Sequence, residues 1–129
     1  MDTQELHDRG LKMRREVFGA EAVDGRVEAL GEFGAPLQNI INAYAYGDVW
    51  QRDNLPMSVK SLVMVAMMAA AGRQMEMRVH LNGAKANGCT AAEVQDVLLL
   101  LALYCGIPAA NEAHRAAVEV FGKDMPPTS

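Results

Sequence analysis

An uninterrupted apolar run near the middle of the chain limits its fold more than any other feature. Residues 62–71 read Leu-Val-Met-Val-Ala-Met-Met-Ala-Ala-Ala, and Ser58 is a suitable N-cap for a helix that contains them. Such a helix is hydrophobic on every side, so it must lie in a core or at a subunit interface. One chain of 129 residues has little interior in which to bury it. The run therefore predicts an oligomer, with methionine filling irregular gaps.

The part of the chain before this run contains two predicted amphipathic helices. The first covers residues 3–17 and ends at Gly19, and the second starts near Pro36, which suits a first helical turn, and ends before Gly47. Residues 22–34 are interrupted by glycines, and we interpret them as a loop or a short helix. Residues 49–56 form a connecting loop with the only tryptophan. The apolar stripes are Leu6, Met13 and Val17 in the first helix, and Leu37, Ile40, Ile41 and Tyr44 in the second.

The part after the run predicts three more helices. Residues 73–88 form one that ends at Asn87-Gly88, because glycine adopts the left-handed conformation without strain. Thr90 and Glu93 form a capping box for a helix that runs to Tyr104. The last helix spans about residues 109–121, and residues 126–129 are expected to fray. No strand-like alternation occurs, so the sequence predicts an all-α single domain over residues 1–129, with a core at about 15–121 and a tail at 123–129.

Charge and cysteine content narrow the possible functions. The net charge is −4 and no basic block occurs, which argues against a nucleic-acid partner. No apolar stretch is long enough to span a membrane, and the polar N-terminus does not resemble a signal peptide. The two cysteines, Cys89 and Cys105, form neither a Cys-x-x-Cys pair nor a metal-binding cluster with histidine. We therefore expect a reduced cytoplasmic protein without a metal site.

Glu76 and His80 are the strongest candidates for chemistry. They are four residues apart in a predicted helix, so their side chains lie on the same face. A carboxylate that holds an imidazole is a common proton donor or acceptor near neutral pH. The same spacing also fits an exposed ion pair on a helix, and periodicity alone does not decide between the two interpretations.

Several motifs resemble the 4-carboxymuconolactone decarboxylase family, within the alkylhydroperoxidase D-like superfamily. The resemblance extends over residues 15–121, and its last motif is the most specific because neither helix propensity nor packing requires that order. The matching residues are Val17-Phe18-Gly19, Val23-Asp24, Tyr44-Ala45-Tyr46-Gly47-Asp48-Val49-Trp50-Gln51-Arg52, Lys60-Ser61-Leu62, Gly72-Arg73 with Glu76 and His80, Asn87-Gly88, and Tyr104-Cys105-Gly106-Ile107-Pro108-Ala109-Ala110-Asn111.

The resemblance implies a fold of about six or seven helices and interlocked subunits, usually a homohexamer built as a trimer of dimers. It also implies removal of CO2 from 4-carboxymuconolactone to give 3-oxoadipate enol-lactone in protocatechuate catabolism. No cofactor is expected, because the electrons of the departing carboxylate flow through the ring double bond into the lactone carbonyl. The protein must then supply an oxyanion donor, a proton and groups that hold the substrate's carboxylates.

Within this resemblance we expect His80 to donate the proton or stabilise the oxyanion, and Glu76 to orient its imidazole. Arg73 and Arg52 are candidates for binding carboxylate, because a guanidinium meets a carboxylate in a bidentate fork; either also fits a surface arginine. The remaining candidates could line the pocket, although core packing for an aromatic and helix capping for the asparagine are alternatives. These candidates are Tyr44, Trp50, Tyr104 and Asn111. Of the other residues, Cys105 is expected to be buried, Cys89 to lie in a loop, and His7 and His114 to be solvated.

Departures from the family pattern leave other functions open. Met57 and Ser58 stand where basic residues are common, with only Lys60 retained, and His114 replaces a usual hydrophobic residue. A diverged paralogue that acts on another lactone or keto acid is therefore an alternative. So is a non-catalytic oligomeric binding protein. Peroxidase chemistry of the superfamily needs a Cys-x-x-Cys pair ahead of the histidine, and Arg73 and Glu76 occupy those positions, which excludes it at this site.

Overall fold

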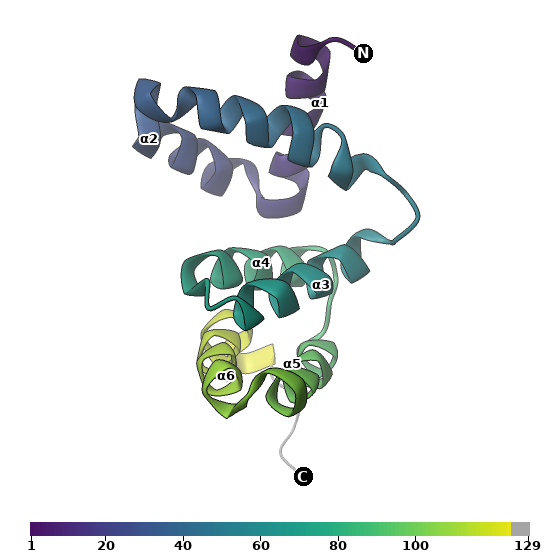
Figure 1. The fold of residues 1–129 in the computed structure, drawn as a ribbon, viewed down its shortest axis with the longest axis vertical. Helices are drawn as coiled ribbons and strands as arrows, with labels where there is room; N and C mark the ends of the chain where they lie inside the picture. Colours follow the sequence, from purple (N-terminus) through teal and green to yellow (C-terminus); the bar gives the residue numbers. More distant parts are fainter. Residues whose placement is uncertain (125–129) are drawn as a thin grey trace. The chain divides into compact units, whose positions relative to one another are not determined.

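The computed structural model describes residues 1–124 and consists of helices over that range (Figure 1). It contains six α-helices and short π and 3-10 segments, with no strand among the described residues, which confirms the predicted all-α class there. The chain divides into two compact units, Met1–Leu55 and Pro56–Ser129. The single domain over residues 1–129 stays a prediction, and the tail predicted to fray lies outside the described residues.

Two α-helices form most of the first unit. α1 (Thr3–Phe18) begins at Asp2, whose carboxylate accepts a hydrogen bond from the Glu5 backbone N–H at 2.8 Å, and it ends at Gly19 as predicted. α2 (Ala20–Ile40) corrects the interpretation of residues 22–34 as a loop or a short helix. The helix passes through the glycines with a single kink at Gly31, where φ is 57° and ψ is −151°. Only glycine adopts this backbone conformation readily.

A π-helical segment, η1 (Ile41–Tyr46), continues α2 and packs against α1. The two backbones approach so closely that a β-carbon on Gly10 of α1 would overlap the carbonyl of Asn42. Gly47, just beyond η1, meets α1 in the same way at the carbonyl of Leu6. Two glycines without side chains therefore allow this crossing. A short 3-10 helix, η2 (Val49–Gln51), follows.

The apolar stripe predicted for the second helix faces solvent instead of the core. Leu37, Ile40 and Tyr44 are all about half exposed, and Phe33, which extends the stripe, is 98% exposed. Only Ile41 is partly buried. Apolar side chains spaced three or four residues apart form a ridge that can pack against another helix. These exposed residues, together with Leu30, form such a row and are available for an intermolecular contact.

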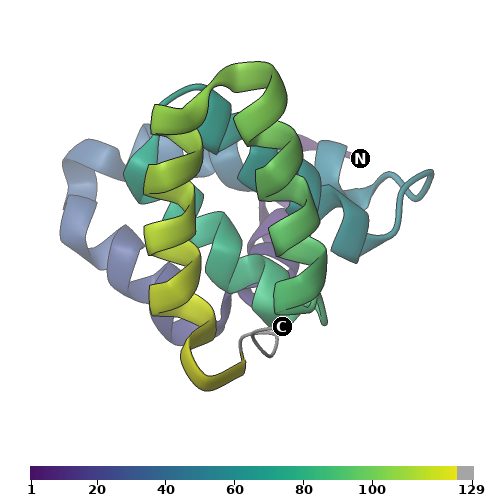
Figure 2. The same cartoon turned by 90° about the horizontal axis from the view of Figure 1, so that it is seen from below.

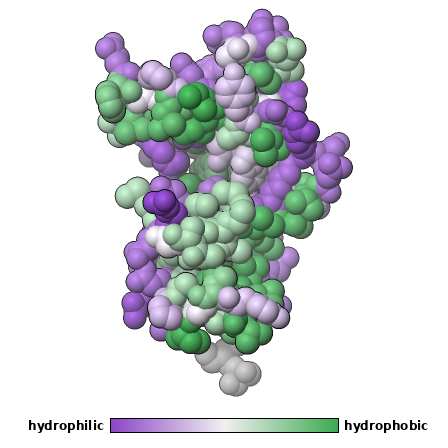
Figure 3. All heavy atoms as spheres, viewed as in Figure 1, coloured by the Kyte–Doolittle hydropathy of each residue, from purple (hydrophilic) through white to green (hydrophobic). Residues whose placement is uncertain are grey.

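The second unit begins with α3 (Met57–Ala70), which contains most of the apolar run. Pro56 occupies the N-cap position, so the predicted N-cap at Ser58 is wrong; Ser58 lies in the first turn. A proline at that position fixes the extended backbone that precedes a helix. α3 buries Ser61, Val65 and Ala69 and leaves an apolar face exposed (Figure 3), as expected of a helix too hydrophobic for one small core. The exposed residues of that face are Val59, Val63 and Met67.

Three further helices complete the second unit: α4 (Gln74–Ala86), α5 (Ala91–Cys105) and α6 (Ile107–Phe121), followed by the 3-10 turn η3 (Gly122–Asp124). α5 and α6 lie side by side, and α3 packs on α4 (Figure 2). The predicted capping box of α5 is confirmed, with the Glu93 N–H donating to Thr90 Oγ1 at 3.1 Å and the Thr90 N–H donating to Glu93 Oε1 at 2.8 Å. The core of this unit includes Val65, Met77, Leu81, Val94, Leu98, Leu101 and Phe121.

The two cysteines differ from the prediction in one respect. Cys89 is buried, and its thiol donates to the Ser58 carbonyl at 3.3 Å, whereas Cys105, predicted to be buried, is exposed at the end of α5. Cys105 is the last residue of α5, one turn beyond Leu101, where the buried face of the helix ends. None of the helices in residues 1–124 combines the length and apolar character that crossing a membrane requires.

Candidate functional site

His80 lies buried on α4, at the end of the second turn of the helix. It is 8% exposed, and it shares the buried side of α4 with Met77, Leu81 and Ala84. Among the residues whose burial is described, few charged or polar side chains are buried to this degree, and a buried polar group needs a specific reason to be kept there. Glu76 is one turn earlier on the same helix and is exposed. The helix therefore carries an accessible carboxylate one turn before an imidazole that is largely removed from water.

Arg73 is the N-cap residue of α4 and is exposed. Together with Met77, Ala109 and Glu112 it lines a cavity of about 20 Å³ among α3, α4 and α6. That volume admits about one water molecule. Arg73 therefore lies at the start of the helix that contains His80. Glu112 of α6 lines the same small cavity as Arg73.

Two other predicted residues of the second unit are exposed. Tyr104 is 79% exposed near the end of α5 and lines an apolar groove of about 430 Å³ that also contains Val63, Met67 and Leu100 from α3 and α5. Asn111 is exposed within α6. Because Gly106 is the N-cap of α6, the alternative that Asn111 caps this helix is wrong.

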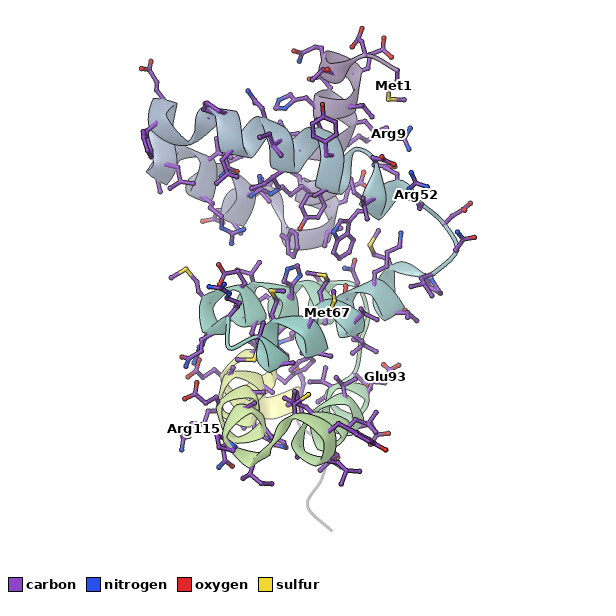
Figure 4. The ribbon with its side chains drawn as sticks, viewed as in Figure 1. Met1, Arg9, Arg52, Met67, Glu93 and Arg115 are labelled. Atoms are coloured by element: carbon purple, nitrogen blue, oxygen red, sulfur yellow. The ribbon has the colours of Figure 1, made fainter. Side chains whose placement is uncertain are left out.

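The remaining predicted residues belong to the first unit. Trp50 is buried and stacks on Tyr46, with ring centroids 5.3 Å apart, which matches the core-packing alternative for one aromatic. Tyr44 is about half exposed on η1. Arg52 follows η2 and forms an exposed ion pair with Asp48 at 3.0 Å (Figure 4). Such a pair contributes little free energy, so the guanidinium can exchange this carboxylate for another.

Arg14 is a buried cation that the sequence interpretation missed. Its Nη1 donates to Gln38 Oε1 at 2.7 Å and to Asn42 Oδ1 at 3.1 Å. Burial lowers the pKa of the Arg14 guanidinium, and burial raises the pKa of the neighbouring Tyr46 to about 12. Arg14 is four residues after Gly10 and three before Val17, the other buried residues of α1. This helical spacing is the signal that could have placed Arg14 on the inner face.

The side chains of the other two histidines, His7 and His114, lie in different environments. His114 is exposed, as predicted, and its Nδ1 lies 2.7 Å from the Ala110 carbonyl, which requires a hydrogen on that nitrogen. His7 corrects the prediction of a solvated side chain, because its Nδ1 is enclosed without a hydrogen-bond partner. Among residues 1–124, no group of three or more His, Cys, Asp or Glu side chains is arranged to hold a metal ion.

Comparison with known proteins connects these features to one family. Residues 35–119 match the model of the carboxymuconolactone decarboxylase family. A 4-carboxymuconolactone decarboxylase of Acinetobacter baylyi is 40% identical over 125 residues, which cover 97% of this chain and 92% of that protein. A nitrosuccinic acid decarboxylase of Metarhizium robertsii is 35% identical over 84% of this chain and 76% of that protein. A 4-carboxymuconolactone decarboxylase of Pseudomonas putida is 38% identical over 48 residues.

Proposed function

The chain belongs to the carboxymuconolactone decarboxylase family, and from this premise we propose that it is a carboxy-lyase that converts 4-carboxymuconolactone into 3-oxoadipate enol-lactone. The observation that carries the proposal is the 40% identity to a 4-carboxymuconolactone decarboxylase over nearly the whole length of both proteins. The matched region includes α4, with the buried His80 and the accessible Glu76.

The reaction requires the protein to position the substrate and to deliver one proton. When the C–C bond to the carboxylate breaks, its electron pair passes through the ring double bond to the carbonyl oxygen of the lactone, which gives CO2 and a dienolate. A proton must then be delivered to the ring carbon next to the carbonyl to form the enol-lactone. An apolar environment favours the first step, because a carboxylate loses its stabilising water there. A proton donor near that carbon completes the second.

We assign the proton donation, or stabilisation of the oxyanion, to His80. Its burial would hold the imidazole in one position and remove competing water, and Glu76 would orient it. Arg73 and Arg52 are proposed to bind carboxylate, and the remaining residues to contact the rest of the substrate. The proposed contact residues are Tyr44, Trp50, Tyr104 and Asn111. The aromatic stacking of Trp50 gives that side chain a packing role as well.

A second candidate function is decarboxylation of a related acid, and the relative named nitrosuccinic acid decarboxylase favours it. Nitrosuccinic acid and 4-carboxymuconolactone are both dicarboxylic acids in which one carboxylate can leave toward an electron acceptor, a nitro group in the first and an unsaturated lactone in the second. The departure at Met57 and Ser58 is compatible with such a change of substrate. The lower identity, 35% against 40%, ranks it second.

We expect the purified protein to consume 4-carboxymuconolactone, followed by the loss of ultraviolet absorbance and by identification of the enol-lactone. Nitrosuccinic acid, assayed in parallel for CO2 release, should react with a kcat/KM at least about 100-fold lower, because a carboxy-lyase discriminates through contacts made in the transition state. The reverse preference would select the second function. A folded protein that accelerates neither reaction would contradict both.

We also propose that the chain assembles as a homohexamer, a trimer of dimers, in a reducing cytoplasm. The apolar groove between α3 and α5 and the exposed row on α2 both support self-association, because monomers rarely leave such patches uncovered. The free thiols of Cys89 and Cys105 fit a reducing compartment.

Introducing a charge into the groove should break this assembly. We expect Met67→Glu to lower the mass measured by light scattering from that of six chains to that of a smaller species, because the carboxylate would be buried without a partner. Ala92→Glu is the matched control, since Ala92 is exposed in the first turn of α5, where an acidic residue is favourable. A wild-type protein that is monomeric at micromolar concentration would contradict the proposed assembly.

A further inference from the structure

The guanidinium of Arg14 is buried in the first unit without a negatively charged partner. The residue is 3% exposed, and it takes part in no ion pair among residues 1–124. Its hydrogen-bond partners Gln38 and Asn42 are neutral amides that accept from Nη1. A buried cation is normally balanced by an anion, because the water that would solvate it has been removed. The missing counter-charge therefore indicates a place for an anionic ligand.

The groups nearest to Arg14 do not supply that charge. The Arg14 Cζ lies 5.9 Å from the centre of the Tyr46 ring, and a contact with the face of a neutral ring attracts a cation without supplying a negative charge. Tyr46 stays protonated at neutral pH because burial raises its pKa to about 12. Arg26 adds a second positive charge that acts on both Arg14 and Tyr46. The local charge is therefore positive.

One edge of the guanidinium is not used by the fold. Nη1 donates both of its hydrogens to the two amides, whereas the Nε–H and the Nη2 hydrogens have no acceptor among residues 1–124. The Nε–H and one Nη2–H are parallel, and this fork matches the two oxygens of a carboxylate. In the described part of the chain, His7 Nδ1 is the fully enclosed side-chain atom without a hydrogen-bond partner, so the unused nitrogens of Arg14 are not fully enclosed.

We propose that this edge of Arg14 binds a carboxylate of the ligand in a bidentate pair, with Gln38 and Asn42 holding the guanidinium in place and Arg26 adding attraction. The identity of the ligand rests on the proposed function: 4-carboxymuconolactone carries an acetate arm that stays on the product, and a residue that binds this arm selects dicarboxylic substrates. The binding itself requires only a carboxylate, so it can be measured without turnover.

The direct test uses succinate, a dicarboxylate without an electron acceptor next to either carboxylate. In protein labelled with ¹⁵N at arginine, we expect the Nε–H resonance of Arg14 to shift and saturate as succinate is added at constant ionic strength. Arg14→Lys identifies that resonance by its absence and keeps the positive charge in the fold. Arg15→Met is the matched control: Arg15 is the exposed neighbour that pairs with Asp24, and its loss should leave the Arg14 shift unchanged.

In the decarboxylation assay, Arg14→Lys should raise KM by about 10–100-fold and change kcat less, because a carboxylate contact made in both the ground state and the transition state contributes uniform binding. A saturable Arg14 shift in a protein that does not decarboxylate 4-carboxymuconolactone would retain this inference and reject the proposed function. Normal turnover with no Arg14 shift, or weak shifts of every arginine without saturation, would overturn the inference.

Discussion

Replacing His80 with alanine is expected to lower kcat for 4-carboxymuconolactone by about 10²–10⁴-fold, the usual contribution of a positioned proton donor. The dienolate that remains after CO2 departs would then depend on water for its proton, and no side chain at position 80 would hold a proton donor in place. KM should change much less, because the imidazole is proposed to act on charge that develops during the reaction. Steady-state kinetics on the assembled protein measures both quantities.

Two controls separate chemistry from structure in this experiment. Free imidazole should restore part of the rate of His80→Ala, because it can enter the vacated space and donate the proton, whereas it should not affect the wild-type enzyme. Glu76→Gln should reduce kcat less than His80→Ala does, since it keeps a group that can accept a hydrogen bond from the imidazole. Wild-type turnover by His80→Ala would contradict the assignment, and a protein without activity before substitution would favour the binding-protein alternative.

Local signals in the sequence predicted several helix ends that depend on a few neighbouring residues, although the N-cap assigned to Ser58 was wrong. The capping box at Thr90 and Glu93 and the stop at Asn87-Gly88 both lie where they were expected, because each forms from hydrogen bonds within one turn. The interpretation failed over residues 22–34, where each glycine was counted as a break. Gly31 alone leaves the helical conformation, and the other glycines of this segment are accommodated within the helix, where each lowers helix propensity without breaking it.

Burial of the candidate residues was harder to predict, because it depends on how helices cross. The spacing of Glu76 and His80 predicted one shared face, yet the structure buries the imidazole and exposes the carboxylate. Arg14 and Arg15 are adjacent and chemically identical, and only the spacing of Arg14 to Gly10 and Val17 indicates which one lies inside. Arg14 is enclosed because η1 crosses α1 at Gly10, one helical turn away, and that contact is a property of the tertiary structure.

The close approach of α1 and η1 at Gly10 should make the stability of the protein sensitive to substitution there. Gly10→Ala should lower the free energy of unfolding by about 3 kcal/mol, the upper end of the usual cost of overpacking, because the new methyl group would overlap the backbone carbonyl of Asn42 and backbone cannot move aside as a flexible side chain can. Urea unfolding followed by circular dichroism measures the change. The displaced Asn42 would also lose its position as an acceptor for Arg14, so succinate binding should weaken in the fraction that remains folded.

The matched control is Gly25→Ala, the same chemical change at a helical position of α2 where a β-carbon would meet no atom within 4 Å. Alanine restricts the unfolded chain and favours the helix, so this variant should be about 0.5–1 kcal/mol more stable than the wild type. Opposite signs for the two substitutions would show that the cost at Gly10 comes from the contact with η1 and not from alanine itself. Equal stability of Gly10→Ala and wild type would contradict the close approach of α1 and η1, and with it the enclosed position of Arg14 on which the carboxylate site depends.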